Sequence, residues 1–301
     1  MANILRHSAP LAILLCAARV HGQELEPRAY SPSPVGVNFA LASYGRSTGE
    51  VLTDPAAPID NIQAKLNFGV TGYGRTFPLA GHSASAVIAV PYVWGDIKGE
   101  VFEEQRAITR SGLADIKLRL ATNLIGGPAL TPREFMRRTP ATTLGVSLSI
   151  VAPTGQYDPD KLINIGTNRW AFKPEIGVTI PHGKWMFDAF AGLWLFTDNP
   201  EYFGGVRRAQ DPMPTLQAHV SYTVRPGLWV AFDSTYYFGG QSTIGGVVQS
   251  DRKENTRAGI TASLPIGRGN ALKLNWSRGA TTRFGSSFTS YGLAWQYTWF
   301  D

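Results

Sequence analysis

The strongest constraint on the fold is a two-residue period that recurs from Pro34 to the C-terminus. Apolar residues occupy every second position over segments of about ten residues, and turn residues separate the segments. In one segment Leu144, Val146, Leu148 and Ile150 alternate with small or polar residues. This period is that of a β-strand with one apolar face, and no window has a sustained helical period. The chain is therefore predicted to be all-β.

The alternation predicts twelve strands, at residues 34–44, 61–76, 82–94, 113–124, 142–153, 170–181, 184–196, 213–224, 227–239, 255–265, 269–278 and 288–300. An even number of strands of this length is typical of the antiparallel up-and-down barrels of Gram-negative outer membranes. Short turns such as 182–183 and 226–227 alternate with long connections, at residues 45–58, 95–110, 154–169, 197–212, 239–254 and 279–287. With a periplasmic N-terminus the long connections would be outer loops. Segment 125–141 breaks this alternation, which indicates either a periplasmic excursion or a miscounted strand.

Composition leaves a soluble β protein or a membrane barrel, and the placement of the aromatic residues favours the membrane barrel. Charged residues make up 17% of the chain, against about 25% in a typical soluble domain. The longest uncharged apolar stretch, Ala9–Ala18, is half the ~20 residues that a membrane-spanning helix needs. Bundles of transmembrane helices are therefore excluded. Aromatic residues fall near strand ends, as in membrane-interface girdles, at Tyr73, Tyr92, Trp94, Trp170, Trp185, Tyr236, Phe238 and Trp299. A soluble sandwich or lipocalin-like barrel with these rings in its core is the alternative. The aromatic last strand, Tyr297 to Phe300, predicts recognition by the barrel-insertion machinery, and the lipid bilayer is the other expected partner.

The N-terminus predicts export. Residues 1–22 have the basic start, apolar centre and small-residue end of a signal peptide, which leaves a barrel domain at 23–301 without Cys16. Loss of Arg6 and Arg19 leaves 26 basic and 22 acidic residues, a net charge of +4. The basic residues are scattered, whereas nucleic-acid binders cluster them on one face. The expected location is the outer membrane, with no nucleic-acid partner.

The faces opposite the apolar ones are predicted to line the lumen. On this register the lumen-facing candidates are Lys65, Asp115, Lys117, Arg119, Lys173, Glu175, Asp188, Trp194, His219, Trp229, Asp233, Arg257 and Lys273. The charges could brace the wall as ion pairs or form a polar conduit with a slight anion preference, and bracing is favoured. Phe190 and Tyr237 share this face, which indicates an apolar occupant. That occupant could be a loop, the segment Gln23 to Pro34, or a hydrophobic passenger, and filling by the chain itself is favoured.

Enzyme and metal motifs are scarce, so no catalytic residue, metal or cofactor is expected. His219 and Ser221 lie two residues apart on one strand face, where the imidazole could serve as the base of a nucleophilic serine, with Asp233 nearby. A hydrogen-bonded polar pair is the favoured interpretation. Calcium ligands are conceivable at Asp158 and Asp160, or at Asp198 to Glu201. Solvated acidic loops are the favoured interpretation there.

The second half of the chain carries a family resemblance. Residues 152–160 read Ala-Pro-Thr-Gly-Gln-Tyr-Asp-Pro-Asp, residues 163–177 read Ile-Asn-Ile-Gly-Thr-Asn-Arg-Trp-Ala-Phe-Lys-Pro-Glu-Ile-Gly, and residues 236–240 read Tyr-Tyr-Phe-Gly-Gly. With 195–199 and 210–212, these segments resemble the outer-membrane transporter family labelled "MetA-pathway of phenol degradation". The resemblance implies an outer-membrane barrel associated with uptake of aromatic compounds, and it carries no site residues over. The expected function is a passive channel for small, aromatic or hydrophobic molecules. The alternatives are a lipid hydrolase using Ser221 and His219, and a non-conducting structural or adhesive barrel.

Overall fold

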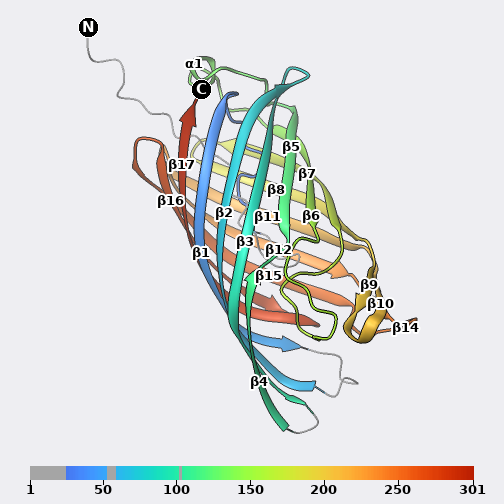
Figure 1. The fold of residues 1–301 in the computed structure, drawn as a ribbon. Helices are drawn as coiled ribbons and strands as arrows, with labels where there is room; N and C mark the ends of the chain where they lie inside the picture. The colour runs from blue at the N-terminus through green and yellow to red at the C-terminus, as the bar shows by residue number, and fades with distance from the viewer. Residues whose placement is uncertain (1–24, 53–58, 102–103) are drawn as a thin grey trace.

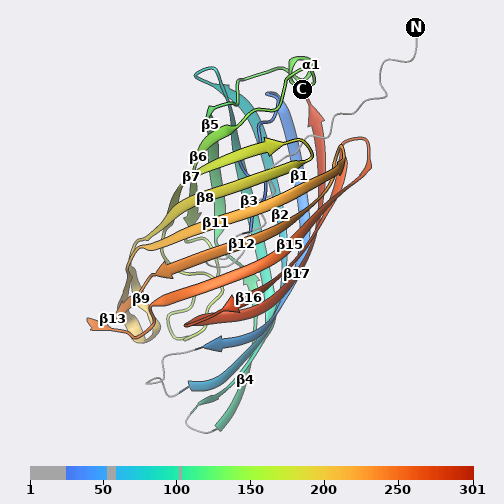
Figure 2. The same ribbon diagram turned by 180° about the vertical axis from the view of Figure 1, so that it is seen from behind.

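The protein is a closed antiparallel barrel of twelve strands, as the alternation predicts. The computed structural model describes residues 25–52, 59–101 and 104–301, so the predicted signal peptide lies outside the described residues. The barrel strands are β1 (Val37–Leu52), β2 (Ile59–Leu79), β3 (His82–Val101), β5 (Ile116–Ile125), β6 (Thr143–Ala152), β7 (Ala171–His182), β8 (Trp185–Phe196), β11 (Met213–Arg225), β12 (Leu228–Gly239), β15 (Lys253–Gly267), β16 (Asn270–Thr281) and β17 (Gly285–Phe300). The β1–β17 pairing closes the ring from Val37↔Phe300 to Leu52↔Gly285 (Figures 1 and 2). Closure pairs the backbone of the first and last strands and removes the exposed edges of an open sheet.

Several expected loops are strands instead. β1 reaches Leu52, β3 reaches Val101 and β17 begins at Gly285, so much of 45–58, 95–110 and 279–287 continues the wall. The returning strand β4 (Glu104–Leu113) pairs with the outer half of β3, whereas β5 pairs with the inner half. Figure 1 shows this β3–β4 hairpin extending past the rest of the barrel. In loops 197–212 and 239–254, β9 (Asn199–Tyr202), β10 (Val206–Gln210), β13 (Ser242–Ile244) and β14 (Val247–Val248) form a second, small sheet.

Segment 125–141 is an excursion at the end of the barrel, and the strand count is unaffected. It holds one short helix, α1 (Pro132–Phe135), whose first turn carries a capping box between Thr131 and Glu134. Figure 1 places α1 beside the C-terminus. The same segment touches the start of β3 through a bridge between His82 and Pro128. Among the described residues, no helix is long and apolar enough to span a membrane.

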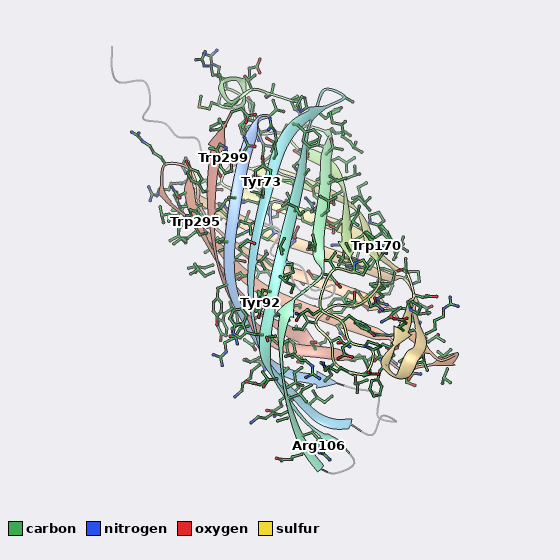
Figure 3. All side chains as sticks on the ribbon, in the orientation of Figure 1. Tyr73, Tyr92, Arg106, Trp170, Trp295 and Trp299 are labelled. Carbon is green, nitrogen blue, oxygen red and sulfur yellow. The ribbon has the colours of Figure 1, made fainter. Side chains whose placement is uncertain are left out.

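The outer face of the barrel is apolar. Large exposed side chains include Ile176 at 47%, Phe232 at 58% and Leu293 at 44% of their area, and the positions between such side chains point inward, among them the buried Glu175 and Asp233. Contiguous exposed apolar surface of this kind fits a lipid environment. Tyr73 and Trp299 lie with their ring centroids 6.2 Å apart near the C-terminal end, while Tyr92 and Trp170 lie nearer the loop end (Figure 3). Aromatic side chains therefore occur toward both ends of the apolar surface.

Candidate functional site

The barrel interior is filled by the chain's own segment Leu25–Pro34. Residues 26–34 are all buried. Side chains of the segment reach strands on several sides of the ring: Glu26 lies near β5, Arg28 contacts β8 and β11, and Tyr30 contacts β6 and β7. A segment that touches so many strands of a closed ring lies inside it. Of the three predicted occupants, filling by Gln23 to Pro34 matches this arrangement.

Arg28 is the first anchor of this segment, which we call the lumen segment. Its backbone N–H donates to Asp188 Oδ2 at 3.1 Å, and its guanidinium donates to Ser221 Oγ at 2.9 Å and Thr223 Oγ1 at 2.7 Å. The guanidinium carbon also lies 4.6 Å from the ring centre of Trp229, in cation–π range. These contacts join the lumen segment to β8, β11 and β12.

Tyr30 is the second anchor. Its side chain is 1% exposed, and its hydroxyl donates to Glu175 Oε1 at 3.0 Å and lies 2.9 Å from Ser147 Oγ. Phe190 packs edge-on against the ring with centroids 5.0 Å apart, and the Arg119 guanidinium lies 5.2 Å from the ring centre. The ring and the hydroxyl are therefore both held by the wall.

Toward the C-terminal end of the lumen segment, the wall binds main-chain oxygens of the segment. Asn123 Nδ2 donates to the Tyr30 carbonyl at 3.2 Å, and Ser83 Oγ donates to the Ser33 carbonyl at 2.8 Å. Thr76 Oγ1 donates to the Pro34 carbonyl at 2.7 Å. Because the acceptors are main-chain carbonyls, these hydrogen bonds position the segment independently of its side chains.

Several buried ionisable side chains of the wall have partners within the wall. Lys173 Nζ lies 2.6 Å from Glu175 Oε2, which also accepts from Gln217 at 3.1 Å. His219 Nδ1 lies 2.7 Å from Asp233 Oδ1, and Thr261 donates to the other oxygen of Asp233 at 2.6 Å. The Lys173–Glu175 pair offsets the desolvation of both charges in a low-dielectric interior. The arrangement corresponds to the bracing interpretation.

Eleven of the thirteen lumen-facing candidates are buried: Asp115, Lys117, Arg119, Lys173, Glu175, Asp188, Trp194, His219, Trp229, Asp233 and Arg257. Lys273 is half-buried, with its Nζ 5.5 Å from the ring centre of Trp229. Arg257 donates to Ser277 and Ser290, which ties β15 to β16 and β17.

Lys65 is the exception, and its predicted placement in the lumen is wrong. Its side chain is exposed, while its neighbour Ala64 is 2% exposed, so the register of β2 is shifted by one residue and its faces exchange. Lys65 opposes Asp96 in a part of β2 that lies beyond the Tyr92 level of the wall, where an outward charge need not meet lipid. The inner face of β1–β3 includes an apolar cluster of Leu41, Val70 and Ala89.

Asp115 fastens the long loop 153–170 to the wall. Its Oδ1 accepts from the Gly155 N–H at 2.9 Å, and its Oδ2 accepts from the N–H and hydroxyl of Thr167 at 2.9 and 2.6 Å. The sequence motif from 152 to 167 is therefore a loop folded onto one carboxylate, at the break between β4 and β5.

Replacing Asp115 with Ala is expected to loosen this loop while the barrel persists. Hydrogen bonds to a charged group contribute about 1.5–3 kcal/mol each, so we expect tryptic cleavage after the exposed Lys161 to accelerate by at least about tenfold. Limited proteolysis followed by mass spectrometry measures it. Asp158→Ala, which removes only contacts within the loop, with Lys161 and the Asp160 N–H, is the matched control. Equal cleavage in the two variants would contradict the role of Asp115.

His219 and Ser221 do not form a nucleophile–base pair. Ser221 accepts from Arg28, while His219 Nδ1 is occupied by Asp233 and its Nε2 has no hydrogen-bond partner among the described residues. Ser221 is fully buried beneath the lumen segment. The pair serves to hold Arg28 and Asp233, and nothing in this geometry favours the hydrolase alternative.

The acidic loops are engaged with protein cations. Asp158 pairs with Lys161 at 2.5 Å, and this hydrogen bond together with the N–H of Asp160 lowers the pKa of the Asp158 carboxyl. Asp198 pairs with Arg207. Over the ranges that the structure describes, no three metal-ligating side chains come together.

The fold and the filled lumen define the class: this is a β-barrel with the architecture of outer-membrane channels. Residues 46–297 match the family model described as "Putative MetA-pathway of phenol degradation", and the chain belongs to that family. No curated protein matches the sequence.

Solved structures agree on the fold. The COG4313 outer membrane channel from Pseudomonas putida F1 superposes with a TM-score of 0.76 at 22% identity, over 92% of this chain and 100% of that one. The β domain of the Bordetella autotransporter Brka reaches 0.51 at 13% identity, over 88% and 100%. The translocator domain of autotransporter NalP from Neisseria meningitidis reaches 0.50 at 10% identity, over 89% and 90%. At these identities the likeness concerns the architecture.

Tyr30 and Arg28 are anchors that were not among the predicted site residues. Neither belongs to an alternating segment. The available signal was indirect, since Gly145 and Gly177 sit within alternating strands, where glycine often marks a close approach of another group.

Proposed function

We propose that the protein is an outer-membrane channel for small aromatic or hydrophobic molecules, and that the lumen segment controls its passage. The observation that carries this proposal is the occupied interior: a ten-residue segment held by side chains inside a ring whose outer face suits lipid. The inner wall supplies aromatic surface at Phe190, Trp194 and Trp229, each at most 7% exposed. Solutes that stack on rings would find partners there. With the long loops on the outer side of the membrane, the end that carries the C-terminus and α1 is periplasmic.

A cavity of about 20 Å³ lies between the lumen segment and β1–β3 and β5, lined by residues that include Ser31, Ser33, Phe39 and Ser83. That volume holds about one water molecule. An aromatic solute fits at this place only when the lumen segment moves.

Uptake by cells tests this function. We expect cells that produce the protein to accumulate radiolabelled aromatic solutes, such as benzoate, toluene and 4-methylphenol, faster than cells without the gene, with a glucose control unchanged. The expected gain is several-fold for at least one aromatic compound. Equal accumulation of every compound with and without the gene would contradict the proposal.

A non-conducting structural or adhesive barrel is the second candidate, because the interior is filled and β9, β10, β13 and β14 form an extra sheet at the loop end. Single-channel recording separates the two. Discrete conductance steps, however small, support a channel. A silent bilayer with correctly folded protein supports the structural barrel.

A further inference from the structure

The pocket that holds the Tyr30 side chain has the composition of a binding site for a free phenol. Two edges of the ring face glycines: Gly145 lies along the Cδ1–Cε1 side and Gly177 along the Cδ2–Cε2 side, and a Cβ at either position would overlap the ring. Glycine in a strand interior weakens the strand, so its presence at both positions has a local reason. Because neither glycine carries a side chain, the wall leaves a slot between them that is one aromatic ring wide.

The slot also recognises the hydroxyl. The Tyr30 hydroxyl gives its hydrogen to Glu175 Oε1 at 3.0 Å, so at the 2.9 Å contact it accepts from Ser147 Oγ. Glu175 is held in place by Lys173 at 2.6 Å and Gln217 at 3.1 Å. One acceptor and one donor thus meet one phenolic oxygen, and a carboxylate acceptor makes that hydrogen bond one of the stronger kind.

The ring itself is recognised by two further groups. Phe190 meets its edge at an interplanar angle of 78°, and the Arg119 guanidinium faces it at 5.2 Å. These are the favoured geometries for an aromatic ring beside another ring and beside a cation. None of the side-chain contacts uses the backbone of residue 30, which is held separately by Asn123.

We propose that this slot is a phenol-binding site of the channel and that Tyr30 is its built-in competitor. A phenolic solute takes the ring position when the lumen segment withdraws, with its para substituent along the path of the Tyr30 Cβ. Substituents at the meta positions would meet Gly145 and Gly177. The proposal deepens the channel function and rests on it for the transport step, whereas binding in the slot is measured independently.

The first experiment vacates the slot. Tyr30→Ala protein, purified in detergent, is unfolded by heat with 4-methylphenol, toluene or 3,5-dimethylphenol. We expect 4-methylphenol to raise the Tm, and toluene and 3,5-dimethylphenol to bind at least about tenfold more weakly, because the first leaves Glu175 and Ser147 unmatched and the second does not fit. The double variant Tyr30→Ala/Gly145→Leu, in which a side chain fills the slot from the face that meets only the Tyr30 ring, should lose the response. Equal responses to the three compounds, or an unchanged response in the double variant, would overturn the proposal.

A second measurement keeps Tyr30 and does not depend on the folding of that variant. In a Cys16→Ser/Ser31→Cys protein in liposomes, 4-methylphenol should speed maleimide labelling of the buried position 31 several-fold by displacing Tyr30, and toluene should not. An unchanged rate would overturn the competitor role. Phenol binding without cellular uptake of any aromatic compound would contradict the channel function but support the binding slot. Uptake without phenol binding would contradict the slot but support the channel function.

Discussion

Deleting residues 25–34 is expected to raise the single-channel conductance of the reconstituted barrel by at least about tenfold, since an unfilled twelve-stranded barrel is wide enough for solutes. The wall does not depend on the deleted residues, because the β1–β17 pairing closes the ring without them. Planar-bilayer recording measures the effect. Heat-modifiable migration on a denaturing gel shows that the shortened protein still folds.

A length-matched control separates anchoring from bulk. Replacing the side chains of Arg28 and Tyr30 with Ala keeps the segment in the chain but removes its side-chain contacts with Ser221, Thr223 and Glu175. We expect an intermediate conductance with frequent transitions, as the segment leaves and returns. Wild-type conductance in the folded deletion protein would show that the lumen segment does not limit passage.

Locking the same segment tests whether it moves during transport. The Ser31 hydroxyl lies 3.3 Å from Met186 Sδ, so cysteines at these two positions, with Cys16 replaced by Ser, are near enough for a short bis-methanethiosulfonate crosslinker to join the segment to β8. The crosslink should abolish aromatic uptake, and dithiothreitol, which cleaves it, should restore uptake. Uptake that persists in the crosslinked protein would contradict a moving segment.

The strand count could be predicted because each barrel strand must sort its side chains between lipid and interior. The sorting is clearest where charges mark the inner face, as in β7 with Lys173 and Glu175, both buried between exposed apolar neighbours. Turn residues at positions such as Gly183 and Gly227, each with a positive φ, then fix the strand ends. Pattern and turn chemistry agree in these strands, so the sequence is sufficient there.

The same reasoning fails where both faces are weakly polar or small. In β2 the inner face carries Ala64 and Val70 while Lys65 points outward, so hydrophobicity alone selects the opposite register. The reason is that β2 has 21 residues and continues past the lipid-facing zone, where an outward lysine needs no shielding. The length of β2 therefore decides whether an outward lysine is tolerated, and the local alternation of residues does not reveal that length.

The contacts of the lumen segment lie beyond sequence reasoning for another reason. Tyr30 meets Ser147 and Glu175, which are 117 and 145 residues away along the chain. The predicted list contains the wall partners, such as Glu175, Asp188 and Arg119, because alternation places them inward. The list lacks Arg28 and Tyr30, because a segment without alternation gives no way to assign side chains to an inner or an outer face. Half of each contact could therefore be predicted, and the pairing required the structure.

Lys173→Met is expected to cost about 3–5 kcal/mol of barrel stability, because it leaves the Glu175 carboxylate buried without its cation. The two side chains are 4% and 5% exposed and 2.6 Å apart, so water cannot replace the lost partner. Reversible urea unfolding in lipid vesicles, followed by tryptophan fluorescence, measures the loss. The exposed pair Arg283–Glu254, at 61% and 57% exposure, provides the matched control, and Arg283→Ala should leave the unfolding midpoint nearly unchanged.

The double variant Lys173→Met/Glu175→Gln completes the test. It removes both charges and keeps one amide oxygen, which can accept from Tyr30 in place of Oε1. The amide NH2 group then faces Gln217 in place of Oε2, and Gln217 can accept from it through its own carboxamide oxygen. We expect most of the lost stability to return, since replacing a whole buried ion pair is often close to neutral. A double variant as unstable as Lys173→Met would mean that the lysine acts through packing against Trp194, 5.8 Å from its ammonium group. Recovery would instead mean that the interior charges of this barrel are kept in pairs because neither member is tolerated alone.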